Sequence, residues 1–303
     1  MNSIAKGGTV LLLSAFLLAF FIAPARCCEL FFDGVALWAT AVLPAVFPFL
    51  FATAMLTNLG ASRKLSALCA PIAKKAFRVS ALGGSLFALS VLSGYPVGSR
   101  LLADSVARGD ISQTEAQKLA PLLSSCGPLF LLGSVGAGLF RSRAIGAVLL
   151  LSNFLAVSAS GVLLRFRKGG QSDAPPPLSA SSLSETLLSS VLTVLTVGAY
   201  IALFSAAAGI LLELPFLSRL PETAKGAIAG LVEMTTGCRL LASPCRLNVA
   251  LCAFFVTFGG ACVLLQQLTF LSPPVRALPF LGAKLLQGVL AFLFAFLICP
   301  YHL

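Results

Sequence analysis

The sequence is poor in charge and in the side chains that perform enzyme chemistry. Its 303 residues include one histidine and ten acidic residues, and only 10% of them are charged. It contains no Walker phosphate-binding loop, no His-Glu-x-x-His zinc motif and no pair of acidic residues within one apolar segment. These absences argue against an intramembrane enzyme and against an ATP-driven pump built from this chain alone. We expect no enzyme activity and no cofactor.

The scarcity of charge leaves an apolar chain. Hydrophobic residues make up 58% of it, and the mean hydropathy is +0.99. Such values are typical of a polytopic membrane protein, and about 20 apolar residues per helix allow roughly eight to ten crossings or half-crossings. The net charge of +11 comes from basic residues that lie between apolar runs, not in one patch with aromatics. We interpret them as topology signals and expect the bilayer, not nucleic acid, as the partner.

The nine cysteines do not indicate a metal centre or a disulfide framework. Most of them are scattered through or beside apolar segments, where cysteine acts as a small apolar packing residue. Cys238, Cys245 and Cys252 recur every seven residues, but Pro244 interrupts the run and the sole histidine is His302. We expect no metal site.

Composition divides the chain into four parts. Residues 1–29 contain an apolar run followed by Ala-Pro-Ala-Arg, which resembles a signal-peptidase site; we favour a retained helix over cleavage, because another membrane segment follows at once. Residues 30–168 form a first transmembrane repeat and 185–303 a second. Between them, residues 169–184 are rich in proline and serine, which predicts an exposed cytoplasmic linker.

The two membrane halves show an internal repeat. The segment GSRLLA at 98–103 is answered by GCRLLA at 237–242, and in each half a glycine-containing break follows, SCGP in the first and FGGA in the second. With a cytoplasmic N-terminus and one re-entrant hairpin in each half, more of the 21 basic residues lie on the cytoplasmic side. We therefore predict an all-α membrane fold of two inverted repeats, each with a broken helix hairpin.

Glycine and proline mark where these hairpins break. A non-helical turn at membrane depth persists only when it is buried in protein or lines a wet cavity, so the breaks predict a binding site. The predicted break positions are Gly94, Pro96, Gly98, Gly127, Pro128, Gly237, Gly259 and Gly260.

Arg100 and Arg239 occupy equivalent places in the two repeats, beside these breaks. Two guanidinium groups facing one cavity would suit a small anion with two carboxylates. The alternative is that each arginine extends to its own membrane surface. Glu233, a carboxylate deep in an apolar stretch, either binds a coupling cation or proton or pairs with Arg239. Further hydrogen-bonding groups for a ligand are expected from Tyr95, Ser99, Ser124, Ser125, Thr235, Thr236 and Gln266.

Several motifs resemble a known family. LPAVFPFLF at 43–51, SGYPVGSRLL at 93–102, SSCGPLFLLGSVGAGLF at 124–140, EMTTG at 233–237 and LQQLTFL at 265–271 are similar to the sporulation integral membrane protein family of YlbJ type, among the nucleoside-recognition or gate-domain membrane proteins. The resemblance implies a fold similar to concentrative nucleoside transporters. It also implies transport of dipicolinic acid across the outer forespore membrane, if the host sporulates.

The sequence departs from the expected family pattern at two positions, which leaves the specificity open. Leu264 stands where a histidine is expected, and Cys262 where serine is usual. The alternative function is a nucleoside or nucleobase carrier, which would favour neutral amide and hydroxyl ligands over paired arginines. A homo-oligomer is also left open.

Overall fold

The computed structural model describes residues 3–166, 182–271 and 275–300, and within these ranges the chain is helical with no strand. The linker predicted at 169–184 lies mostly outside the described residues. The first half contains α1 (Ser3–Ile22), α2 (Pro24–Leu37), η1 (Trp38–Val42), α3 (Leu43–Asn58), α4 (Ala61–Ile72), η2 (Ala73–Phe77), α5 (Ala81–Ser93), α6 (Val97–Ala107), α7 (Gln113–Leu119), η3 (Phe130–Leu139), α8 (Arg143–Leu163) and η4 (Leu164–Phe166). The second half contains α9 (Leu183–Leu212), α10 (Glu222–Val232), α11 (Met234–Leu240), α12 (Arg246–Phe258), α13 (Gly260–Leu271) and α14 (Ala277–Ile298).

Helices dominate because hydrocarbon offers no hydrogen-bond partner to a backbone, so each apolar segment must satisfy its own N–H and C=O groups. Within the described part of the chain, five helical stretches are long and apolar enough to cross a membrane. They are Pro24–Asn58, Arg143–Leu163, Leu183–Leu212, Arg246–Leu271 and Ala277–Ile298. This pattern fits the predicted multi-pass membrane protein. The predicted boundary between residues 29 and 30 falls inside α2.

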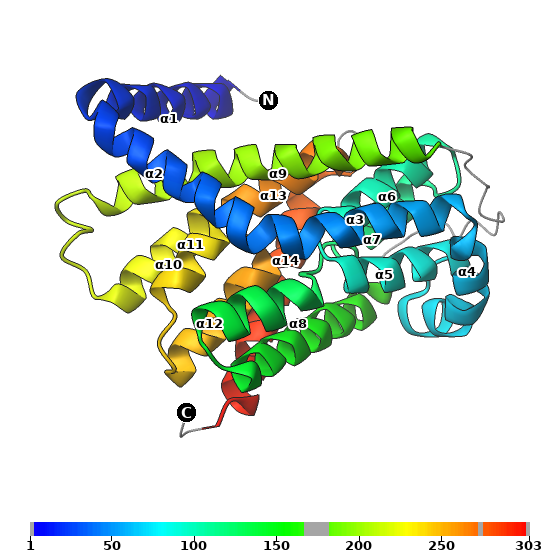
Figure 1. Ribbon diagram of the computed structural model, residues 1–303. Helices are drawn as coiled ribbons and strands as arrows, with labels where there is room; N and C mark the ends of the chain where they lie inside the picture. The colour runs from blue at the N-terminus through cyan, green and yellow to red at the C-terminus, as the bar shows by residue number, and fades with distance from the viewer. Residues whose placement is uncertain (1–2, 167–181, 272–274, 301–303) are drawn as a thin grey trace.

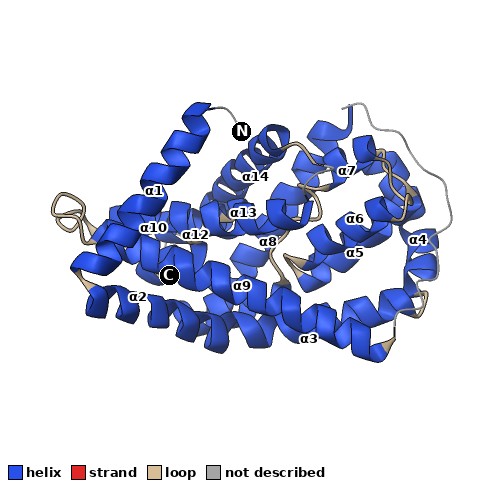
Figure 2. Cartoon of the chain, turned by 90° about the horizontal axis from the view of Figure 1, so that it is seen from above, coloured by secondary structure: helices blue, strands red, loops and turns tan. Residues whose placement is uncertain are grey.

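The longest helix, α9, packs along the continuous span α2–η1–α3 (Figures 1 and 2). Glycines permit this close approach. A Cβ atom on Gly34 would lie 2.8 Å from the Cα of Ala202, and a Cβ on Gly198 would lie 2.7 Å from the ring of Trp38. On the other side of the molecule, α8, α12 and α14 pack against one another.

The two halves share part of their order of elements. Each contains a long span, a pair of short helices, an interrupted segment and a second span, and the first half adds α4 and η2 before the pair and α7 after it. The short helices are α5 and α6 in the first half and α10 and α11 in the second. Each pair forms a hairpin, because Gly98 of α6 lies against Ser90 of α5, and Gly237 of α11 lies against Gly226 and Gly230 of α10.

The two hairpins lie toward opposite ends of α9 (Figure 1). The first lies beside its N-terminal half, where Arg100 donates a hydrogen bond to Thr193. The second lies beside its C-terminal half, where the hydroxyls of Thr236 and Ser205 are 3.0 Å apart. The hairpin tips meet, because the Tyr95 hydroxyl donates to the Met234 sulfur at 2.7 Å. Segment 79–107 is therefore not one continuous helix, and the turn at Tyr95 contacts the turn at Met234.

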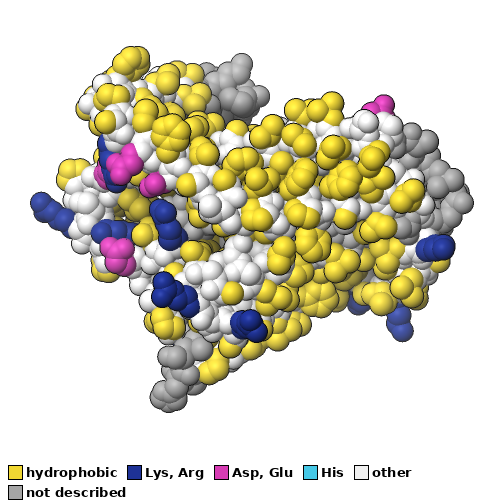
Figure 3. Space-filling view, viewed as in Figure 1, with side chains coloured by type: hydrophobic (Ala, Val, Ile, Leu, Met, Phe, Trp, Pro, Cys, Tyr) yellow, Lys and Arg dark blue, Asp and Glu magenta, His cyan; other side chains and the backbone are white. Residues whose placement is uncertain are grey.

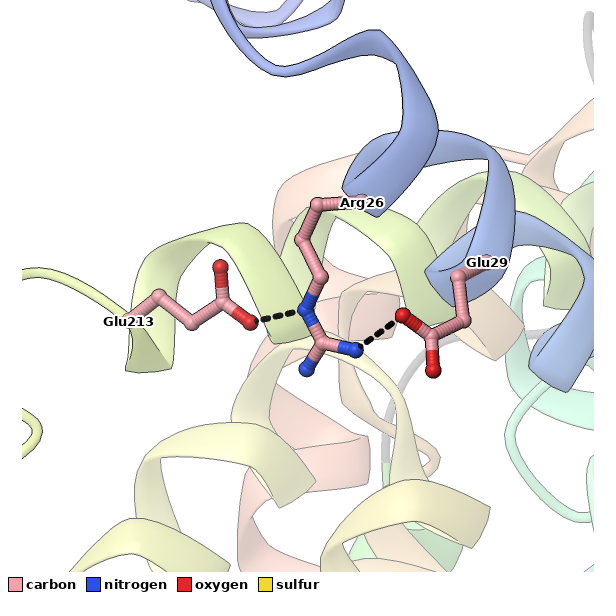
Figure 4. A network of polar contacts seen from close by, with 3 residues as sticks. All are labelled: Arg26, Glu29 and Glu213. Atoms are coloured by element: carbon pink, nitrogen blue, oxygen red, sulfur yellow. Dashed lines mark hydrogen bonds and ion pairs between the residues drawn. The ribbon is translucent and has the colours of Figure 1, made fainter.

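Charge gathers at the two ends of the molecule. Figure 3 shows a broad hydrophobic band between lysine and arginine side chains at either end of the face in view, as expected for a protein that spans a bilayer along α9. At one end, Arg26 bridges Glu29 and Glu213, at 2.6 and 2.5 Å, and so joins α2 to the end of α9 (Figure 4). All three side chains are exposed, so these pairs contribute little stability.

Candidate functional site

At the first break, two unwound segments of the chain lie against each other. Helix α5 ends at Ser93, α6 begins at Val97, and the intervening turn contains a cis Tyr95–Pro96 bond. This turn lies against residues 120–127, which form no helix. Helical structure begins again at Pro128. The Tyr95 N–H donates to the Ser125 carbonyl at 2.8 Å, and the Ser90 hydroxyl donates to the Leu123 carbonyl at 2.5 Å. Backbone groups that no helix satisfies are therefore satisfied across the break.

The second half breaks at Glu233 and at Gly259–Gly260. The Glu233 carboxylate is fully buried and accepts bonds from the Thr235 N–H (3.0 Å), the Thr236 N–H (2.6 Å) and the Thr236 hydroxyl (2.9 Å). It is thus the N-cap of α11. No ion pair joins it to Arg239 among the described residues, so the predicted pairing is wrong. Capping of α11 is a different role from both roles predicted for Glu233.

A small central cavity of about 30 Å³ lies where the breaks meet. Two of the predicted ligand-binding residues, Tyr95 and Gln266, line it, together with Glu233, the predicted coupling or ion-pair residue, and the predicted break residue Gly127. Gln266 is buried, and its Nε2 has no hydrogen-bond partner. The remaining wall comes from α9, from the η1–α3 span and from Ser93, Cys126, Phe130, Met234 and Val263. A volume of this size holds about one water molecule.

The two arginines do not share this cavity, which corrects the predicted paired site. Arg100 lines a pocket of about 450 Å³ with Asp104, Glu185 and Thr193, which we call the Arg100 pocket. Arg239 lines a pocket of about 400 Å³ with Ser205 and Glu213, which we call the Arg239 pocket.

The separation follows from the hairpins, which lie toward opposite ends of α9, with each arginine several residues from its tip. Thr193 and Ser205 are 12 residues apart on α9, so the pockets are separated by roughly 18 Å along the helix axis. Each arginine also shares its pocket with carboxylates, so neither pocket holds only positive charge.

Two glycines predicted as breaks lie within helices instead. Gly98 belongs to α6 and Gly237 to α11. Their role is close packing: a Cβ on Gly98 would collide with the Leu123 carbonyl, and one on Gly237 would collide with the backbone of Gly230. Helix α12 ends at Phe258 and α13 begins at Gly260, and both Gly259 and Gly260 have positive φ angles.

The other predicted ligand-binding residues are buried around the breaks but outside the central cavity. The Ser99 hydroxyl donates to Gln267 Oε1 at 3.1 Å and so ties α6 to α13. The Ser125 hydroxyl accepts a bond from Asn153 at 3.0 Å. Thr236 lines the Arg239 pocket. The hydroxyls of Ser124 and Thr235 are buried without a hydrogen-bond partner.

Two buried polar residues near the breaks were not among the site residues predicted from the sequence. Asn153 of α8 bridges the halves, because it donates to Ser125 and accepts from the Thr257 hydroxyl at 3.1 Å. Lys284 of α14 is fully buried and donates to the Ser124 carbonyl at 2.6 Å. The signal for Lys284 was present, since an ionisable residue within an apolar span is costly and usually functional.

Comparison with known proteins gives one informative similarity. No protein-family model matches the chain, and no solved structure matches it. Over 308 aligned positions the chain is 30% identical to the sporulation integral membrane protein YlbJ of Bacillus subtilis (strain 168), and the match covers 88% of this chain and 76% of that protein. With this identity and coverage, and with the motifs that surround the two breaks, the chain belongs to the YlbJ-type family of sporulation integral membrane proteins.

Proposed function

We propose that the protein is a carrier for a small organic anion, with dipicolinate as the best candidate, in the outer forespore membrane during sporulation. One observation carries the proposal: unwound segments from both halves meet around a small, mostly apolar cavity that Tyr95, Glu233 and Gln266 also line, between two larger pockets toward opposite ends of α9. The sporulation context comes from the name of the Bacillus subtilis relative.

The pocket sizes favour a carrier over a channel. The central cavity of about 30 Å³ is too small for an aromatic dicarboxylate, whereas the outer pockets of about 450 and 400 Å³ are large enough. A substrate must therefore displace a hairpin to pass. The partly shared element order and the opposed hairpins support an inverted repeat, in which the two halves open alternately.

The proposed anion preference rests on Arg100 and Arg239 themselves and not on the net charge of the outer pockets, which also contain carboxylates. On this proposal the substrate meets Arg100 on one side and Arg239 on the other. Gln266 supports the alternative, a nucleoside carrier, because its unpartnered amide in the central cavity would suit a neutral ligand.

Reconstituted protein should accumulate dipicolinate and not uridine. We expect Arg100→Gln and Arg239→Gln each to weaken apparent dipicolinate affinity by about tenfold or more, because each removes a charged hydrogen-bond donor. The measurement is uptake of both compounds into proteoliposomes. Arg246→Gln is the control, because Arg246 lies over the Phe296 ring at 4.1 Å, outside both pockets, and should leave dipicolinate affinity unchanged. Uridine uptake without dipicolinate uptake would favour the nucleoside carrier.

A further inference from the structure

Lys284 and Gln287 lie one turn apart on α14, and both support the unwound segment 120–127. The Lys284 ammonium donates to the Ser124 carbonyl at 2.6 Å. The Gln287 amide donates to the Pro121 carbonyl at 3.0 Å and to the Ser160 hydroxyl at 2.9 Å. Both side chains are fully buried.

This backbone support does not require a charge. An unwound segment in an apolar surrounding needs hydrogen-bond donors for its carbonyl groups, and Gln287 meets that need with a neutral amide. The carbonyl of Leu123 is likewise satisfied by the neutral hydroxyl of Ser90. The positive charge at Lys284 therefore calls for another explanation.

The charge of Lys284 has no carboxylate beside it. Within the part of the chain that the structure describes, no ion pair involves Lys284. The buried carboxylate of Glu233 is occupied by the N–H groups of Thr235 and Thr236. An uncompensated ammonium within a membrane span is costly. An anion at this place would remove that cost.

The position of Lys284 also suits a ligand. Its bonding partner Ser124 has a buried hydroxyl without a partner. Two residues further on, Cys126 lines the central cavity. A lysine ammonium has three N–H donors, and the Ser124 carbonyl takes one of them.

We infer that Lys284 binds a carboxylate of the transported anion at the first-half break, with the Ser124 hydroxyl as a second donor. The inference rests on the proposed carrier function and identifies the residue that recognises the anion between the two outer pockets. Movement of the ammonium from the Ser124 carbonyl to the substrate would also loosen the segment next to the cavity, which couples binding to opening.

The test is binding of dipicolinate and of its neutral analogue pyridine-2,6-dicarboxamide to the full-length protein in detergent, by equilibrium dialysis. Lys284→Gln keeps a donor for the Ser124 carbonyl and removes the charge, so dipicolinate affinity should fall by at least about tenfold and diamide affinity should not. Lys284→Arg should retain dipicolinate binding. Gln287→Met is the matched control, because it removes a neutral donor from the same segment and should affect both ligands equally.

The outcomes separate the two proposals. Equal weakening of both ligands by Lys284→Gln, or no weakening, would make Lys284 a structural support only, with dipicolinate transport by the wild type still intact. A wild type that neither binds nor transports dipicolinate would overturn the anion carrier and this inference together. If Lys284→Gln does not fold, Lys284→His serves instead, and its dipicolinate affinity should rise as pH falls below the ordinary imidazole range, because burial disfavours the charged imidazole until it is protonated at lower pH.

Discussion

Replacing Gly94 with alanine should abolish the folded state or lower its unfolding free energy by about 3 kcal/mol or more. Gly94 has φ 77° and ψ 178°, a backbone conformation that is essentially restricted to glycine. A Cβ atom there would overlap the backbone nitrogen of Gly127 and lie 2.7 Å from its Cα. Backbone atoms cannot rotate away as a side chain can, so the two unwound segments would have to separate. Thermal unfolding in detergent measures the effect.

Gly109 provides the control for this substitution. Its φ is 79°, close to that of Gly94, but a Cβ atom there would meet no atom within 4 Å. Gly109→Ala should therefore cost only the conformational penalty, about 1–2 kcal/mol. Equal destabilisation by the two substitutions would show that the contact between Gly94 and Gly127 does not hold the break together.

Some of the break positions could be predicted from sequence because glycine and proline act locally, although Gly98 and Gly237 lie within helices. Pro96 and Gly94 end α5 wherever the segment lies, and the paired glycines at 259 and 260 end α12 with positive φ angles. Local chemistry does not determine which segment satisfies the broken backbone. The contact between Gly94 and Gly127 joins residues 33 positions apart, and no pattern in the sequence indicates it.

The positions of the two arginines also show that local sequence does not determine which distant segments meet. The match between GSRLLA and GCRLLA predicted equivalent places for Arg100 and Arg239, and each lies on the second arm of its hairpin, α6 and α11. Equivalence does not mean proximity, however. Because the hairpins meet at their tips and lie toward opposite ends of α9, residues behind the tips diverge. Similarly, Glu233 could be identified as a buried carboxylate, but its role depends on α11 beginning at the next residue.

Replacing Glu233 with glutamine should destabilise the protein by about 3 kcal/mol or more, although the two side chains have nearly the same shape. The carboxylate accepts three hydrogen bonds in a fully buried place. The glutamine amide would direct an N–H₂ group at one of the N–H donors of Thr235 or Thr236, which leaves that donor buried and unsatisfied. The unfolding midpoint in detergent should fall at every sodium concentration and every pH at which the wild type is stable.

Glu185 makes a useful comparison, because its carboxylate also accepts a backbone N–H at the start of a helix, but in water. It accepts the Ser182 N–H at 2.9 Å at the exposed start of α9. There water can replace a lost bond, so Glu185→Gln should cost less than about 1 kcal/mol. If Glu233→Gln is equally mild but removes a sodium or proton dependence of transport, the carboxylate is a coupling site. If it is severe under all ionic conditions, Glu233 is the cap that allows α11 to begin at the hairpin tip, and the tip geometry depends on it.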